Sequence, residues 1–181
     1  YYSYETPHDP KFPEVASFKG QVIRPQFWPE DLDYQDKTVV IIGSGATAMT
    51  LVPAMAKKAK QVTMLQRSPT YVLSRPSEDW FANGLRKIMP STWAYAVTRI
   101  RNTLFQEFLF KQARKYPAMA KRLLIRQLRK QLGKDYDVEK HFTPNYNPWD
   151  QRLCLVPDDD LFKAISSGSA TVVTDHIQRF T

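Results

Sequence analysis

Residues 39–48 read Val39-Val40-Ile41-Ile42-Gly43-Ser44-Gly45-Ala46-Thr47-Ala48, and this stretch decides the fold of the 181-residue chain. Together with Thr38, its first four residues form a β-branched run that is apolar from Val39 to Ile42, which predicts a strand buried on both faces of a parallel sheet. Gly43 ends the run, and residues 46–58 have apolar side chains at helical spacing. Pro53 lies inside this predicted helix and should kink it or cost about 3 kcal/mol relative to alanine. A strand, a glycine turn and a helix in this order predict an α/β protein.

The glycine turn has the spacing Gly43-x-Gly45-x-x-Ala48, which is typical of dinucleotide binding when a strand precedes it and a helix follows. Gly43 permits the tight turn, Gly45 lets the backbone approach a pyrophosphate, and Ala48 lets helix and strand pack closely. The start of the helix adds free N–H groups and a partial positive charge for the phosphates. The predicted cofactor-binding residues of this Rossmann-like turn are Gly43, Ser44, Gly45, Ala46, Thr47 and Ala48. The alternative is a tight strand–helix turn that binds no ligand.

A second strand, predicted at residues 62–65, is followed by Gln66-Arg67-Ser68, and these residues indicate which dinucleotide is bound. NAD sites usually have Asp or Glu here, because a carboxylate binds the ribose 2′-hydroxyl, and FAD sites normally have the acid as well. This stretch contains no acid. Arg67 is a fork-shaped donor suited to the 2′-phosphate of NADP, and the Ser68 hydroxyl adds another donor. The sequence thus favours NADP(H), with an ordinary surface arginine as the alternative for Arg67.

Residues 77–135 predict a helical insertion between two parts of the nucleotide domain. Ser77 is the expected N-cap of the first helix, Pro90-Ser91 separates the first helix from the second, and Gly133 ends the third. Each helix carries an apolar stripe that we expect to face the core: Phe81, Leu85 and Ile88 in the first, Trp93, Val97, Ile100, Leu104 and Phe108 in the second, and Leu124 and Leu128 in the third.

The segments around this insertion complete the predicted organisation. A linker is expected at residues 1–37, the first half of the nucleotide domain at 38–76, and the return into it at 136–181. Within the return we expect irregular chain at 141–157, a helix at 160–166, a third strand at 170–174 and the start of another strand at 176–181. The predicted fold class is therefore α/β, a Rossmann-like parallel-sheet domain with an inserted helical subdomain.

Composition fits a globular chain, because 43% of the residues are hydrophobic and 24% are charged. No apolar run approaches the length of a membrane span, so we expect a soluble chain. Tyr1-Tyr2-Ser3-Tyr4 has no signal-peptide features and predicts the interior of a larger protein. Cys154 is the only cysteine, which excludes an internal disulfide and suits the cytoplasm. The three histidines show no metal-ligand spacing, so no metal site is predicted.

The positive charge is concentrated in one segment. The chain has a net charge of +8, and residues 99–134 contain eleven Lys or Arg and one acid, Glu107. Such a segment attracts nucleic acid, anionic lipid or an acidic partner. The more common interpretation is the solvated face of amphipathic helices. Of the charged partners, we expect weak membrane association more than nucleic acid.

A family resemblance is carried by residues 18–29, Phe18-Lys19-Gly20-Gln21-Val22-Ile23-Arg24-Pro25-Gln26-Phe27-Trp28-Pro29. They resemble the fingerprint of Baeyer–Villiger monooxygenases, Phe-x-Gly-x-x-x-His-x-x-x-Trp-Pro, which in that family also lies just before a second glycine motif. The fingerprint residues are Phe18, Gly20, Arg24, Trp28 and Pro29. The stretches 43–74 and 136–162 look especially like the ethionamide-activating type. Arg24 replaces the family histidine, and it keeps a positive donor but does not titrate near neutral pH.

The resemblance implies two cofactors, NADP(H) and FAD, of which FAD is bound through an N-terminal glycine motif that this chain lacks. We therefore expect a middle portion of an enzyme whose FAD domain lies elsewhere in the same protein, with the fragment inactive alone. In the family, NADPH reduces the flavin, and O2 then supplies one oxygen to a ketone or a sulfur. The nearest alternative is another two-cofactor enzyme, of the N-hydroxylating or dimethylaniline type.

The resemblance also implies roles for two residues of Trp149-Asp150-Gln151-Arg152. The family arginine that holds the nicotinamide end and stabilises an anionic intermediate falls on Arg152, an electrostatic role in catalysis. Gln151 falls where some members have a lysine that binds the 2′-phosphate. The alternative for Arg152 is a structural ion pair with Asp150 or another carboxylate.

Overall fold

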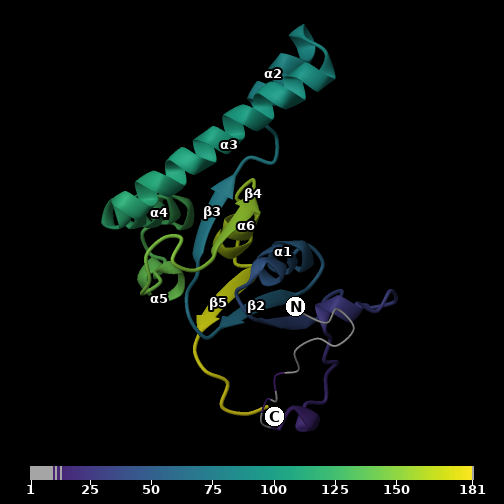
Figure 1. Cartoon of the computed structure of the whole chain (residues 1–181). Coiled ribbons are helices and arrows are strands. Elements are labelled where there is room, and N and C mark those ends of the chain that lie inside the picture. The colour runs from purple at the N-terminus through teal and green to yellow at the C-terminus, as the bar shows by residue number, and fades with distance from the viewer. Residues whose placement is uncertain (1–9, 11, 13, 181) are drawn as a thin grey trace.

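The computed structural model describes residues 10, 12 and 14–180. Residues 1–9, 11 and 13 of the predicted linker, and the last residue of the predicted final strand, therefore lie outside the described part. In chain order the elements are the 3-10 helices η1 (Val15–Ser17) and η2 (Pro25–Phe27), followed by β1 (Thr38–Ile42), α1 (Ala46–Met55), β2 (Gln61–Gln66), β3 (Tyr71–Arg75), α2 (Trp80–Ile88), α3 (Ser91–Lys115), α4 (Pro117–Leu132), α5 (Val138–Phe142), β4 (Leu153–Pro157), α6 (Asp160–Ser166) and β5 (Ala170–Thr174) (Figure 1).

Three parallel strands form the sheet that carries the glycine turn, in the order β1-β2-β5. This arrangement confirms the predicted α/β class and the predicted third strand. The prediction that β1 is buried on both faces is wrong, because Val40 is 56% and Ile42 44% exposed. β1 is an edge strand, and the face that bears Val40, Ile42 and Val173 is open to solvent among the described residues.

A second, two-stranded parallel sheet is formed by β3 and β4, with Val72 opposite Cys154. The expectation of irregular chain at 141–157 is therefore wrong for 153–157, and α5 covers the first residues of that range. Leu153 and Leu155 alternate with the buried Cys154 and Val156, which is strand periodicity. The prediction missed this strand because the prolines and asparagines just before β4 are typical of loops.

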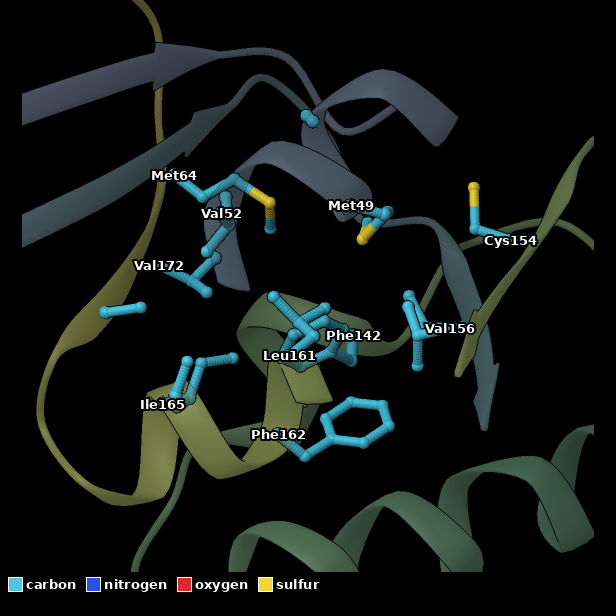
Figure 2. Packing of buried hydrophobic residues seen from close by; sticks show 14 of the residues in the cluster. Met49, Val52, Met64, Phe142, Cys154, Val156, Leu161, Phe162, Ile165 and Val172 are labelled. Carbon is cyan, nitrogen blue, oxygen red and sulfur yellow. The ribbon is translucent and has the colours of Figure 1, made fainter. Parts of the chain in front are cut away.

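One hydrophobic core joins the two sheets. The helices α1 and α6 cover the inner face of the larger sheet, and Figure 2 shows Met49 and Val52 of α1, Leu161 of α6 and Val172 of β5 pointing toward one another. Phe142 of α5 and Val156 of β4 extend the same cluster toward the smaller sheet. The end of β4 and the glycine turn are thereby held in one packed unit.

The insertion forms an arm in which α2 and most of α3 project beyond the sheets (Figure 1). Its α4 belongs to the core, since Leu128 is buried as predicted and Leu124 packs against the cluster. The predicted inward stripe of α3 instead faces solvent: Trp93, Val97, Ile100, Leu104 and Phe108 are all exposed. α3 touches the rest of the described chain mainly through α2 and α4, so this face has nothing to pack against.

Three further boundaries differ from prediction. Asp79 and not Ser77 caps α2, because its carboxylate accepts from the backbone N–H groups of Phe81 and Ala82. α1 includes Pro53 but ends at Met55, since residues 56–60 turn to hydrogen-bond with residues 36 and 37. Residues 176–180 form no strand.

Candidate cofactor site

The glycine turn lies at the carboxyl end of β1, between this strand and α1. Gly43 has a φ of +128°, and its N–H donates to the carbonyl of Leu65 on β2 at 2.7 Å. Ser44 is buried, and its hydroxyl lies 3.3 Å from that of Thr70. Only glycine adopts the backbone of Gly43 without strain. The turn is therefore fixed on both sides, by β2 and by the residue that leads into β3.

The start of α1 has no side chain as a cap. Gly45 is the N-cap residue with extended backbone, and no side chain accepts a hydrogen bond from the first turn. The N–H groups of Ala46, Thr47 and Ala48 thus belong to the part of a helix that lacks intrahelical acceptors. Together with the helix dipole, these groups fit a pyrophosphate at this end of α1.

Arg67 and Ser68 directly follow β2, the neighbour of β1 in the sheet, and both side chains are exposed. Ile42 pairs with Leu65, so the glycine turn and Arg67 leave the sheet at the same edge. Among the described residues Arg67 forms no ion pair. The structure thereby gives Arg67 a position and a free charge suited to a phosphate beside the turn.

Arg152 directly precedes β4 and reaches the glycine turn. A Cβ atom on Gly45 would lie 3.6 Å from Nη1 of Arg152, so the guanidinium lies against the backbone at the start of α1. The alternative of an Arg152–Asp150 ion pair is wrong, because Asp150 pairs with Arg114 of α3. Within the described chain Arg152 has no carboxylate partner. Gln151 is exposed beside it.

The residues that support Arg152 were not predictable from the sequence. The Tyr71 hydroxyl donates to the carbonyl of Tyr146 at 2.7 Å, and the Tyr146 hydroxyl lies 3.4 Å from the carbonyl of Arg152. The two rings meet edge to face, with centroids 5.4 Å apart. Burial raises the pKa of Tyr71 to about 12, so its hydroxyl remains a donor at neutral pH. Tyr71 and Tyr146 are 75 positions apart, which leaves no local sequence signal for the contact.

Cys154 links β4 to the glycine turn, since its thiol is 3.8 Å from the carbonyl of Ser44. Burial raises the pKa of this thiol, which keeps it protonated as a weak donor. Nearby, the buried Gln66 side chain donates to the carbonyl of His141 at 2.7 Å and to the Thr174 hydroxyl at 2.9 Å. The ends of β2 and β5 and the end of α5 are thus bonded together.

The fingerprint residues lie on the amino-terminal segment, away from these contacts. Phe18 folds over Gly20, where a Cβ atom would come within 2.6 Å of its ring, and it meets Phe180 edge to face at 6.1 Å. Figure 1 shows this purple segment beside the yellow C-terminal stretch. Arg24, Trp28 and Pro29 are exposed around η2. Of the fingerprint residues, the structure thus places Phe18 against the C-terminal stretch.

Two classes of feature are absent from the described residues. None of their helices has both the length and the apolarity to cross a membrane. They also contain no group of three or more His, Cys, Asp or Glu residues arranged to hold a metal ion.

Residues 2–178 match the sequence pattern of the family described as flavin-binding monooxygenase-like. The chain is 52% identical over 182 residues to the FAD-containing monooxygenase EthA of Mycobacterium tuberculosis, covering all of this chain and 37% of that protein. It is 54% identical to the probable FAD-binding monooxygenase AlmA of Acinetobacter baylyi, covering 36% of it. The chain thus spans little more than a third of these curated relatives.

Solved structures share the fold at low sequence identity. An oxidised steroid monooxygenase bound to NADP matches 93% of this chain and 38% of its own, with a TM-score of 0.69 and 19% identity. The enzyme OTEMO in complex with FAD and NADP matches with a TM-score of 0.66 and 17% identity, covering 93% of this chain and 39% of its own. The sequence match and the shared fold confirm the resemblance to flavin monooxygenases. The chain belongs to the flavin-binding monooxygenase-like family.

Proposed function

We propose that this chain is the NADP(H)-binding portion of an NADPH- and FAD-dependent monooxygenase, with FAD held by another domain of the same protein. The observation that carries the proposal is the meeting of Gly45, the uncapped start of α1 and the unpaired Arg152 at one edge of the sheet. Relatives named FAD-containing monooxygenases and fold neighbours bound to NADP support it. The division into 1–37, 38–76, 77–135 and 136–181 is part of this proposal.

In this proposal, different residues of the site bind different parts of NADP(H). Gly43 shapes the turn, the N–H groups of residues 44–48 hold the pyrophosphate, and Arg67 with Ser68 holds the 2′-phosphate, with Gln151 as a further polar contact. Arg152 orients the nicotinamide end and offers a fixed positive charge to anions that form during the reaction. NADPH, when bound at these residues, would supply the hydride for reduction of the flavin. In the whole protein, Phe18, Gly20, Arg24, Trp28 and Pro29 connect this segment to the FAD domain.

Substituting Arg67 tests the cofactor assignment directly. In the full-length protein we expect Arg67→Ala to weaken NADP+ binding about ten- to a hundredfold, because hydrogen bonds to charged groups contribute roughly 1.5–3 kcal/mol. Binding of NAD+, which lacks the 2′-phosphate, should change little. Arg86→Ala, an exposed arginine on α2, is the matched control. Equal effects on NADP+ and NAD+ would contradict the assignment, and calorimetric titration measures both.

The proposed substrates are a ketone, with oxygen inserted beside the carbonyl, or a thioether oxidised at sulfur. The competing proposal is N-hydroxylation, as in N-hydroxylating or dimethylaniline-type monooxygenases. Product analysis with one ketone, one thioether and one amine under the same conditions separates the two. An N-oxide or hydroxylamine as the sole product would overturn the first proposal.

A second proposed role, weak docking on an anionic membrane surface, is favoured by the outer face of the arm. The exposed stripe of α3, defined as Trp93, Val97, Ile100, Leu104 and Phe108, overlaps the segment 99–134 with its eleven cations through its last three residues. The single acid of this segment, Glu107, is paired with Lys111. Apolar and aromatic side chains beside cations fit a lipid interface better than nucleic acid. Co-sedimentation with phosphatidylserine vesicles tests this role.

A further inference from the structure

The loop 143–152, which ends at Arg152, has a shape that its own sequence does not explain. Trp149 has a φ of +66°, a left-handed conformation that bulky residues seldom adopt. Two hydrogen bonds inside the loop span it, from the N–H of Asp150 to the carbonyl of Asn147 at 3.0 Å and from the Tyr146 hydroxyl to the carbonyl of Arg152 at 3.4 Å. A conformation of this kind costs about 1–3 kcal/mol and persists only where the surroundings impose it. Contacts from outside the loop must therefore hold Trp149.

The helical insertion supplies these outside contacts at three points. Phe110 of α3 meets the Trp149 ring edge to face, with centroids 6.4 Å apart. Arg114, one turn further along α3, forms an ion pair with Asp150. On α4, Nζ of Lys121 donates to the carbonyl of Pro144 at 2.6 Å. The strained residue is thus bracketed by contacts on either side.

From the same loop, Arg152 reaches the glycine turn. Only Gln151 separates the paired Asp150 from Arg152, whose Nη1 is in contact range of Gly45. The opposite side of the loop is fixed by the Tyr71 hydroxyl on the carbonyl of Tyr146. A shift of Asp150 therefore moves Arg152 relative to the start of α1.

We propose that the helical insertion positions Arg152, with Phe110, Arg114 and Lys121 acting as a clamp on the loop 143–152. Phe110, Arg114 and Lys121 are positioning residues that act through Trp149, Asp150 and Pro144. The clamp gives the insertion a role beyond a surface appendage, because any displacement of α3 is transmitted to the guanidinium beside Gly45. The link from this clamp to cofactor binding rests on the proposed function.

Charge reversal in the full-length protein tests the clamp. Arg114→Glu and Asp150→Arg each break the ion pair, and the double variant restores it with the charges exchanged. In the absence of NADP(H), we expect the backbone amides of residues 146–152 to exchange hydrogen about two- to fivefold faster in each single variant, since exposed ion pairs contribute about 0.2–1 kcal/mol. The exchange rates should return to those of the unsubstituted protein in the double variant. The matched control is Lys111→Glu, which makes the same charge change on α3 but breaks only a pair within that helix.

A second measurement of the same variants reports on NADP(H) binding and turnover. With the clamp broken, we expect the Kd for NADP(H) to rise about two- to fivefold and kcat at saturating NADPH to fall, because the displaced Arg152 serves both cofactor binding and the anions of the reaction, and the double variant to restore both constants. Unchanged exchange in both single variants, or equal loosening by Lys111→Glu, overturns the clamp. Faster loop exchange with an unchanged Kd leaves the clamp standing and overturns the assignment of Arg152 to the cofactor site.

Discussion

Gly43 and Gly45 lie two residues apart in the same turn, but they are glycine for different reasons. The φ of +128° at Gly43 excludes other residues on backbone grounds, and no atom lies within 4 Å of its added Cβ. Gly45 has an ordinary φ of −81°, and its Cβ would make a normal contact with Arg152. The first residue therefore serves the fold, and we infer that the second serves the ligand.

Alanine substitutions should separate these two roles. We expect Gly43→Ala to lower the free energy of unfolding by about 1–3 kcal/mol, because it forces a side chain into a glycine conformation. Gly45→Ala should leave the unfolding midpoint nearly unchanged but weaken NADP+ binding about tenfold or more, because the added methyl keeps the backbone from the pyrophosphate. Thermal unfolding and NADP+ titration measure the two effects. A Gly45→Ala protein that binds NADP+ normally would show that the turn contacts no phosphate.

His141 gives the stability a pH dependence with a definite sign. Burial, with Lys140 adding to it, lowers the pKa of His141 below its ordinary value of 6.5. The unfolded chain therefore binds the proton more readily than the folded one, so stability is present above about pH 6.5 and falls as the pH drops toward the lowered pKa. Nδ1 lies 2.8 Å from the Thr174 hydroxyl, so protonation also limits this contact to donation from His141.

Unfolding midpoints at pH 7.5 and pH 5.5 check this dependence. The drop between the two values should be smaller in His141→Asn, which does not titrate and keeps a polar atom near Thr174. His176→Asn, at an exposed histidine, is the control and should behave as the unsubstituted protein does. An identical drop in His141→Asn would refute the assignment.

At the scale of elements, the start of α2 is stabilised by the side chain of a single N-cap residue, Asp79. Asp79 accepts from the N–H groups of Phe81 and Ala82 and also from Arg101 of α3 at 2.7 Å. We expect Asp79→Ala to reduce the hydrogen-exchange protection of α2 by about 0.5–2 kcal/mol, the usual contribution of an N-cap. Ser77→Ala should leave that protection unchanged, because Ser77 bonds to Asp158 and not to α2. Equal effects of the two substitutions would show that neither residue is the cap.

The same elements show how far sequence reasoning reached. Strand β1, the turn and α1 were predictable, because Thr38 to Ala48 carry local propensity and glycine spacing together. Periodicity found the helix α3 but assigned its apolar stripe to a core, since a stripe identifies a face without identifying what covers it. Strand β4 and the Tyr71–Tyr146 contact were missed because both depend on partners more than 70 positions away. In the proposed site, Arg67 could be predicted from its position directly after the second strand. The role of Arg152 could be predicted only from the family resemblance.

At the scale of the whole molecule, the apolar surfaces that the described residues leave open include the sheet face with Val40, Ile42 and Val173 and the stripe of α3. They differ in charge. The sheet face carries threonines, with the Thr63 and Thr171 hydroxyls 3.2 Å apart, whereas the stripe overlaps the cationic segment 99–134. We therefore expect the neutral face to be covered by the remaining domain of the protein and the stripe to meet an anionic surface.

Removing apolar area from the stripe should reduce vesicle binding. In the full-length protein we expect the double variant Ile100→Ser with Leu104→Ser to bind phosphatidylserine vesicles at least about tenfold more weakly, since each buried side chain contributes roughly 1.5–3 kcal/mol. Binding should also weaken as salt rises. Tyr95→Ser is the matched control, because Tyr95 is equally exposed but lies nine residues, or two and a half turns, from Leu104. Retention of full binding by the stripe variant would contradict the second role.

The pairing of β3 with β4 has a consequence for how this fold tolerates change. These neighbours are joined through residues 76–152, so their pairing must close a very long loop. The entropy of closing a loop grows only with the logarithm of its length, and halving it changes the cost by about 0.6 kcal/mol. Whole turns can therefore be added to or removed from α2 and the outer end of α3 with little effect on the pairing, provided that α4 keeps its place in the core. The arm is the part of this architecture where length is free to diverge between relatives.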